Sequence, residues 1–183
     1  LLDLSKLESG KISVELVVQD VTTLIIDAIS ELGSLLEQKS ITIELNNEQS
    51  QECCIDQKLM SQAFVNLFSN AIKFSPENSM IQVNIERYEG VLNEQQQDIL
   101  GISIEDTGPG IPAEQLETIF EKFIQSSQTT SYAGGTGLGL PITREIIGLH
   151  HGKIWAESPG LGRTVGSVFH IQIPVSQQLE NDI

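Results

Sequence analysis

The sequence is poor in positive charge, in cysteine and in long apolar runs, and each shortage excludes a class of protein. Ten Lys and Arg stand against 25 Asp and Glu, a formal net charge of −15. This balance argues against a nucleic-acid-binding module and against docking on anionic lipid. No apolar run reaches the roughly 18 residues of a membrane-spanning helix. The absence of a start Met and of a signal peptide is typical of a piece of a longer protein.

The two cysteines, Cys53 and Cys54, are adjacent, so neither a CxxC site nor a disulfide framework is present. We expect two reduced, buried thiols and a cytoplasmic setting, although the full-length protein could be anchored in a membrane. The three histidines, His150, His151 and His170, lack a ligand or triad neighbour at a telling spacing and are expected to be structural or surface residues. The 183 residues suffice for one domain with a short appendage.

Helical and strand periodicities alternate along the chain. We expect helices at 22–38, 56–75 and 140–151, a short helix from Pro112, and the end of another helix at 1–11. Alternating segments predict strands at 12–18, 41–45, 81–86, 100–106, 154–156 and 168–174. We expect a polar loop at 46–52 and a polar hairpin or loop at 89–98. Because several strands follow one another through short loops, we expect an α/β two-layer sandwich: a mixed sheet with about three helices on one face.

Helix 56–75 carries an unusual polar stripe. Asn66, Asn70 and Lys73 fall on it together with Gln62, opposite a broad apolar side. Solvated stripes usually carry Glu and Lys, because Asn is a poor helix former. Two Asn at i and i+4 with a following Lys instead offer amide oxygens for a hard cation and an ammonium for a phosphate. The alternative is an ordinary polar side that faces water.

Asp106 ends a predicted strand on the same face as Ile102 and Ile104, so its carboxylate needs a partner. It either caps the turn that follows or accepts an N–H group from a ligand. In the second case Gly108 and Gly110 let the ligand approach the backbone closely.

The glycine-rich run 134–140 leads into a predicted helix, whose N-terminus favours an anion. It lacks the GK[ST] of a Walker A loop, and no strand precedes it as in a dinucleotide fingerprint. From Phe123 to Thr143 the chain has no Asp, Glu, Lys or Arg, so the run lies in an uncharged window of an acidic protein.

Four segments in this order resemble the sensor histidine kinases. They are similar to the N box at Asn66–Ser75, the G1 box at Asp106–Ile111, the F box at Ile119–Phe123 and the G2 box at Gly135–Leu140. The opening residues 1–10 resemble the end of the second dimerisation helix of these kinases, and residues 152–158 also match the family's sequence pattern. The resemblance implies a Bergerat ATP-binding fold. It divides the chain into the end of the dimerisation helix at 1–11, a catalytic ATP-binding domain at 12–176 and a tail at 177–183.

The resemblance implies ATP and Mg²⁺ as ligands and assigns roles by position. Asn70 would ligate Mg²⁺ with help from Asn66, Lys73 would contact the phosphates, and Phe74 would pack on the adenine. Asp106 would accept a hydrogen bond from the adenine amino group. Phe120 and Phe123 would anchor the ATP lid, with simple core packing as the alternative. The other expected nucleotide-site residues are Gly108, Gly110, Ile111, Lys122, Gly135, Thr136, Gly137, Leu138, Gly139, Leu140 and Ser167.

The implied function is transfer of the γ-phosphoryl group of ATP to a histidine on the protein's own dimerisation domain, for relay to an Asp of a response-regulator receiver domain. No histidine of this chain is expected to be that acceptor. An ATP-hydrolysing relative would carry a Glu as general base where this chain has Asn66. A degenerate interaction module is the other alternative, against which the intact boxes argue. Many relatives have an Arg where this chain has Gln125, which leaves Lys122 as the only cation expected near the lid.

Overall fold

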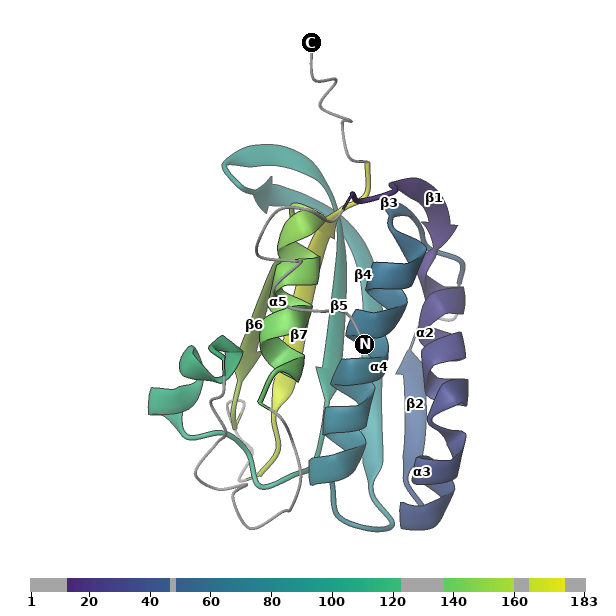
Figure 1. The fold of residues 1–183 in the computed structure, drawn as a ribbon, viewed down its shortest axis with the longest axis vertical. Coiled ribbons are helices and arrows are strands. Elements are labelled where there is room, and N and C mark those ends of the chain that lie inside the picture. The colour runs from purple at the N-terminus through teal and green to yellow at the C-terminus, as the bar shows by residue number, and fades with distance from the viewer. Residues whose placement is uncertain (1–12, 47–48, 123–136, 160–164, 177–183) are drawn as a thin grey trace.

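The computed structural model describes residues 13–46, 49–122, 137–159 and 165–176, and these form two layers (Figure 1). A five-stranded sheet has the order β2-β4-β5-β7-β6, in which β2 is parallel to β4 and every other neighbouring pair is antiparallel. The strands are β2 (Thr42–Asn46), β4 (Met80–Leu92), β5 (Gln95–Glu105), β6 (Lys153–Glu157) and β7 (Val168–Pro174). The predicted mixed sheet is thereby confirmed.

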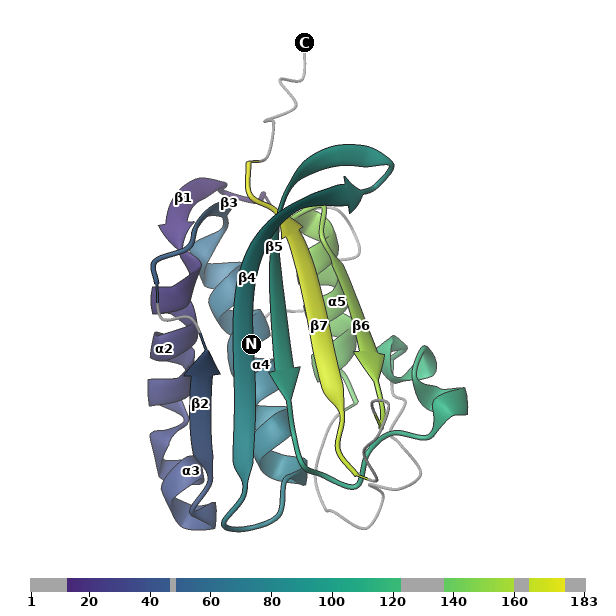
Figure 2. The same cartoon turned by 180° about the vertical axis from the view of Figure 1, so that it is seen from behind.

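All long helices lie on one face of this sheet, and among the described residues the other face carries none (Figure 2). They are α2 (Val21–Glu31), α3 (Gly33–Lys39), α4 (Gln57–Phe74) and α5 (Gly139–Leu149). Two short 3₁₀ helices, η1 (Ala113–Gln115) and η2 (Thr118–Phe120), follow Pro112 as expected. A small antiparallel pair, β1 (Val17–Asp20) and β3 (Glu52–Ile55), lies at one end of the helical layer.

The core lies between the layers. One cross-strand row joins Ile85, Ile102, Ile171 and Ile154 on four neighbouring strands, and all four face the helices. The central helix α4 covers them with fully buried side chains such as Phe64. Because burying each such side chain is worth about 1.5–3 kcal/mol, this row fixes which residues of the strands point to the helices and which point away.

Two helices begin at an aspartate cap. Asp20 Oδ1 accepts the N–H of Thr22 at the start of α2, and Asp56 Oδ1 accepts the N–H groups of Lys58 and Leu59 at the start of α4. The other oxygen of Asp56 accepts the N–H of Glu15, 2.9 Å away. The first turn of α4 is thus tied to the segment that enters the domain.

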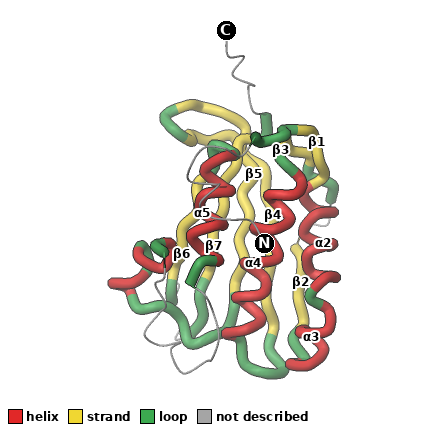
Figure 3. The backbone as a smooth tube through the Cα atoms, in the orientation of Figure 1, coloured by secondary structure: helices red, strands yellow, loops and turns green. Residues whose placement is uncertain are grey.

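Several predicted boundaries are wrong. The helix expected at 22–38 is interrupted at Leu32, which caps α2 and precedes Gly33. The strand expected at 12–18 begins at Val17 and continues to Asp20. Its partner β3 is not predicted as a strand, and it overlaps the predicted loop 46–52 only at Glu52. Of the hairpin or loop expected at 89–98, the hairpin is confirmed: these residues form the far end of the β4–β5 hairpin (Figure 3), which turns at Asn93 and Glu94 with positive φ. Because both faces of this hairpin end are largely exposed, its polar sequence does not alternate.

No helix among these residues has the length and apolar character needed to cross a membrane.

Candidate functional site

The polar stripe of α4 faces the beginning of α5. Asn66 Nδ2 donates a hydrogen bond to Thr143 Oγ1 at 2.7 Å. A Cβ at Gly139 would collide with the Asn66 amide, so only glycine lets the two helices approach this closely. Asn66, Asn70 and Lys73 are half-buried, whereas an ordinary solvated stripe would be exposed.

The N-terminus of α5 differs from those of α2 and α4. Its capping position is Leu138, which makes no side-chain cap, and Gly137 before it has φ 67°. The first-turn N–H groups of an α-helix have no partner within the helix and carry partial positive charge. With Asn66 beside Gly139, this helix end can receive an anion next to the amide groups of α4.

Asp106 is buried, with 4% of its surface exposed, at the end of β5. Ser167 Oγ donates to Asp106 Oδ2 at 2.7 Å, and the N–H of Gly108 donates to Oδ1 at 2.8 Å. Burial raises the pKa of Asp106, and the two hydrogen bonds act in the opposite direction. The carboxylate therefore does cap its own turn. Each of its oxygens still has a lone pair for another donor.

The loop after Asp106 lies against the C-terminal end of α4. A Cβ at Gly108 would lie 2.9 Å from the carbonyl oxygen of Phe74, so the glycine allows this close approach. Gly110 has φ +82°. Ser158 Oγ accepts the N–H of Ile111 and donates to the carbonyl of Gly166, each at 2.7 Å.

Two buried hydroxyl groups near this loop have no hydrogen-bond partner among the described residues. They are Ser75 Oγ, just after α4, and Thr107 Oγ1, next to Asp106. Buried polar groups are nearly always hydrogen-bonded, so orphans here indicate a place where a polar ligand or its water completes the network. The adenine end of the predicted site thus fits a polar heterocycle.

Phe120 is a core residue as well as a candidate anchor. Its ring packs edge-to-face on Phe169, with 6.3 Å between the centroids. The guanidinium of Arg144 lies 5.9 Å from the centroid of the Phe120 ring. Lys122 is exposed, and Arg144 of α5 is a second cation, close to Phe120. The lid residues themselves lie outside the described residues, so the expectation for Lys122 stays a prediction.

The remaining predicted residues divide into two groups. Ile111, Leu138 and Leu140 are half-buried and pack against the core cluster. Phe123, Gln125, Gly135 and Thr136 lie outside the described residues.

Sequence reasoning missed four residues that shape this site: Thr143, Ser158, Gly166 and Lys39. Gly166, with φ +98°, lies against the carbonyl of Asp106. Lys39 Nζ donates to the carbonyls of Ile72, Lys73 and Ser75 at 2.7–2.9 Å, which caps the end of α4. A lysine in the last turn of a helix is a weak signal for a cap. The sequence does not show that Lys39 of α3 caps a different helix, α4, because tertiary packing brings the two together.

The histidine and cysteine expectations are largely confirmed. His150 is buried and structural: its Nε2 accepts the N–H of Asp56 at 2.9 Å, and its Nδ1 bonds the carbonyl of Ile146. Burial lowers the pKa of His150. Both thiols are free, but only Cys53 is buried, which raises its pKa to about 12, whereas Cys54 is half-buried.

The mixed sheet, the buried aspartate beside the end of α4 and the amide stripe facing α5 define the class of Bergerat-type ATP-binding domains. A family model for the histidine kinase-, DNA gyrase B-, and HSP90-like ATPases matches residues 55–177. The chain belongs to this family.

Sensor kinases are similar to the chain over most of its length. The adaptive-response sensory kinase SasA of Gloeothece citriformis is 37% identical over 83% of this chain and 36% of that protein. The sensor histidine kinase WalK of Bacillus subtilis is 37% identical over 70% of this chain and 20% of that protein. A solved catalytic domain of histidine kinase ThkA is 30% identical, with a TM-score of 0.71 over 89% of this chain and 99% of that one. The chain therefore spans about a third or less of these curated relatives.

Proposed function

We propose that the chain is the ATP-binding catalytic domain of a sensor histidine kinase and presents the γ-phosphoryl group of ATP to a histidine outside these 183 residues. One observation carries the proposal: Asn66, in the middle of α4, lies against the uncapped N-terminus of α5, while the buried Asp106 lies near the C-terminal end of the same helix. A nucleotide laid along α4 would place its base at Asp106 and its phosphates at Asn66.

At the base end, Asp106 would accept the adenine amino group while Ser167 and Gly108 hold its carboxylate in place. Phe74 would pack on the ring. The orphaned hydroxyls of Ser75 and Thr107 would bind ring nitrogens directly or through water.

At the phosphate end, Asn70 and Asn66 would supply amide oxygens to Mg²⁺, and Lys73 would contact the phosphates. The hydrogen bond from Asn66 Nδ2 to Thr143 leaves Oδ1 as the ligand atom. The described residues contain no group of three His, Cys, Asp or Glu that could hold a metal, so phosphate oxygens and water would complete the coordination. When bound, the metal neutralises phosphate charge during transfer.

The phosphoryl acceptor would be a histidine of the protein's own dimerisation domain. Within this chain, His150 is buried with both ring nitrogens bonded, and His170 stacks on Trp155 on the face away from α4. A response regulator would then receive the group, as the solved complex of histidine kinase ThkA with response regulator TrrA suggests by analogy. Two free cysteines suit the reducing cytoplasm in which we place this reaction.

A titration of the chain with a non-hydrolysable ATP analogue and Mg²⁺, followed by calorimetry, tests the proposal. We expect the wild type and the exposed-site control Asp27→Asn to bind alike, and Asp106→Asn to bind at least tenfold more weakly. No binding by the wild type would favour a non-catalytic interaction module.

Two further readouts separate the remaining alternatives. We expect negligible ATP hydrolysis, because the Asn66 amide cannot act as a general base. Robust phosphate release would favour the ATPase alternative. A phosphohistidine formed on the isolated chain would contradict an acceptor outside it.

A further inference from the structure

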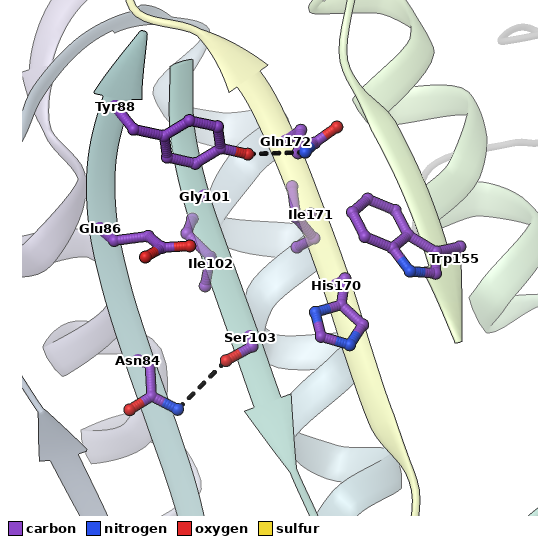
Figure 4. Close-up of a pocket in the computed structure, with 10 residues that line it drawn as sticks. All are labelled: Asn84, Glu86, Tyr88, Gly101, Ile102, Ser103, Trp155, His170, Ile171 and Gln172. Atoms are coloured by element: carbon purple, nitrogen blue, oxygen red, sulfur yellow. Dashed lines mark hydrogen bonds between the residues drawn. The ribbon is translucent and has the colours of Figure 1, made fainter. Parts of the chain in front are cut away.

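Figure 2 shows the face of the five-stranded sheet that the helices leave uncovered. This face contains a hollow of about 190 Å³ (Figure 4). It lies over the middle strands, where every second side chain points away from the core. Two cross-strand rows of residues form it. One contains Glu86, Gly101 and Gln172 and ends at Lys153, and the other contains Asn84, Ser103, His170 and Trp155.

Gly101 forms the floor of the hollow, and Tyr88 forms one of its walls. A Cβ at position 101 would lie 3.0 Å from Cε1 of Tyr88 and 3.3 Å from Cγ of Glu86. The tyrosine ring therefore reaches across the glycine, and its hydroxyl accepts a hydrogen bond from Gln172 Nε2 at 2.6 Å (Figure 4). This bond holds the wall in place before a partner arrives, which lowers the entropy cost of binding.

The opposite wall is a stacked pair of rings. Trp155 and His170 lie with centroids 4.9 Å apart and planes 14° apart. Lys153 Nζ lies 5.8 Å from the Trp155 ring centroid, a contact that cations make with aromatic faces. Two aromatic walls thus flank a floor of small residues, Gly101 and Ser103.

The hollow is negatively charged. Its ten lining residues include one carboxylate, that of Glu86, and neither Lys nor Arg. Glu86 is exposed and makes no hydrogen bond or ion pair within the described part of the chain. Glu105 and Glu157 lie in the next cross-strand row, and Glu44 bonds Gln82 at its end. Lys153, at the far end of the Glu86 row and against the Trp155 ring, is a cation beside the hollow. These four carboxylates outnumber it, so the charge pattern still favours a cation at Glu86.

The size and shape of the hollow select one kind of cation. A volume of about 190 Å³ is below the roughly 300–1,000 Å³ of small-molecule sites, so it suits a single side chain. A guanidinium is planar, weakly hydrated and able to stack on rings while pairing with a carboxylate through two parallel hydrogen bonds. An ammonium is compact and strongly hydrated, so it gains less from flat aromatic walls.

We propose that the hollow receives an arginine side chain of a partner polypeptide. The guanidinium lies between Tyr88 and the Trp155–His170 stack and pairs with Glu86, and the Gln172 and Ser103 oxygens accept its other N–H groups. Because this face is opposite α4, the interaction is independent of the proposed nucleotide site.

Fluorescence provides a direct test, because Trp155 is the only tryptophan in the chain. The probes are acetylated and amidated Gly-Arg-Gly, with Gly-Lys-Gly and the uncharged isostere Gly-citrulline-Gly for comparison. We expect the arginine peptide to change the Trp155 emission saturably, the lysine peptide to bind several-fold more weakly, and the citrulline peptide at least tenfold more weakly. Equal binding of the arginine and citrulline peptides would overturn the proposal.

Variants identify the contact. Glu86→Gln removes the charge in the hollow, and Glu89→Gln removes the same charge three residues along β4 outside it, where it is also exposed. We expect Glu86→Gln to lower the affinity for the arginine peptide about tenfold and Glu89→Gln to change it less than twofold. Both variants should bind the ATP analogue like the wild type. Equal losses of affinity in the two variants would overturn the arginine assignment. Self-association of the chain that Glu86→Gln abolishes would also overturn it, in favour of a second copy of the chain as the partner.

Discussion

In the proposed site, Asp106 would serve the ligand at the expense of the fold. Burial raises the pKa of its carboxyl, so at neutral pH the ionised group is held in an environment that disfavours it. Its folded pKa lies above the unfolded value of about 3.8, so acidification through the folded pKa removes this penalty.

We therefore expect Asp106→Asn to leave the melting temperature at pH 7 unchanged or raised, although it weakens nucleotide binding. The difference from the wild type should shrink as the pH falls towards 4, because the wild-type carboxyl then becomes neutral too. Thermal denaturation of both proteins between pH 7 and pH 4 measures this difference in melting temperature. A variant that unfolds several degrees earlier than the wild type at pH 7 would contradict the expectation.

His150 predicts the opposite pH dependence. Burial lowers the pKa of its ring below the ordinary value near 6.5, so the unfolded chain binds a proton more readily than the folded one. The stability that neutral His150 provides is fully present above pH about 6.5 and is lost as the pH falls through the lowered pKa. We expect His150→Gln to melt earlier at pH 7.5 and to show a smaller loss of melting temperature than the wild type between pH 7.5 and 5.5.

The exposed neighbour provides the matched control. His151→Gln should reproduce the wild-type pH profile, because this side chain is exposed. If the melting temperatures of His150→Gln and the wild type depend on pH in the same way, another group causes the loss of stability at acidic pH.

At the scale of elements, the end of α4 depends on α3. Lys39 donates three charge-assisted hydrogen bonds to carbonyls at the end of the helix that carries Lys73 and Phe74. We expect Lys39→Met to cost about 2 kcal/mol of unfolding free energy, since hydrogen bonds to charged groups are worth about 1.5–3 kcal/mol. We also expect nucleotide affinity to fall several-fold, because the carbonyls that it releases flank the site. Urea denaturation and calorimetry measure the two effects.

The control for this variant lies at the other end of α4. Lys58 is exposed in the first turn, where a positive charge is unfavourable, so Lys58→Met should be neutral or slightly stabilising. Lys39→Arg should recover part of the stability by restoring a charged donor. If Lys39→Met loses stability but keeps full nucleotide affinity, the capping contact does not position the site.

The elements that sequence patterns predict well are those whose pattern reflects one buried face. Helix α4 and strands β5 and β7 follow this rule. Asn66 and Asp106 are predicted as site residues because each is unusual at its position: Asn66 lies where a helix surface usually carries Glu or Lys, and Asp106 continues an apolar strand face. Strand β3 escapes prediction because it is four residues long and is recognised only through its pairing with β1. Thr143, Ser158 and Lys39 escape for the same reason, since each acts through a partner distant in sequence.

At the scale of the molecule, the net charge of −15 opposes the approach of a free nucleotide. Salt screens this repulsion, with a Debye length of about 10 Å at 0.1 M. We expect the association rate of an ATP analogue without Mg²⁺ to rise several-fold from about 20 mM to about 200 mM salt, and the Mg²⁺-bound form to respond less. Stopped-flow kinetics measures both. A rate that falls with salt would show that local cations such as Lys73 and Arg144 outweigh the global charge.

The hydrogen bond between Ser167 and Asp106 spans 61 residues of sequence, and β7, which follows Ser167, is the last strand among the described residues. The β4–β5 hairpin is local and can form as soon as it is made, whereas the β5–β7 pairing must wait for the end of the domain. During synthesis, Asp106 therefore remains without its serine partner until nearly the whole domain has left the ribosome. The base end of the proposed site is completed last, so an incompletely made chain has the helices of the phosphate end and a hairpin before it has a complete nucleotide site.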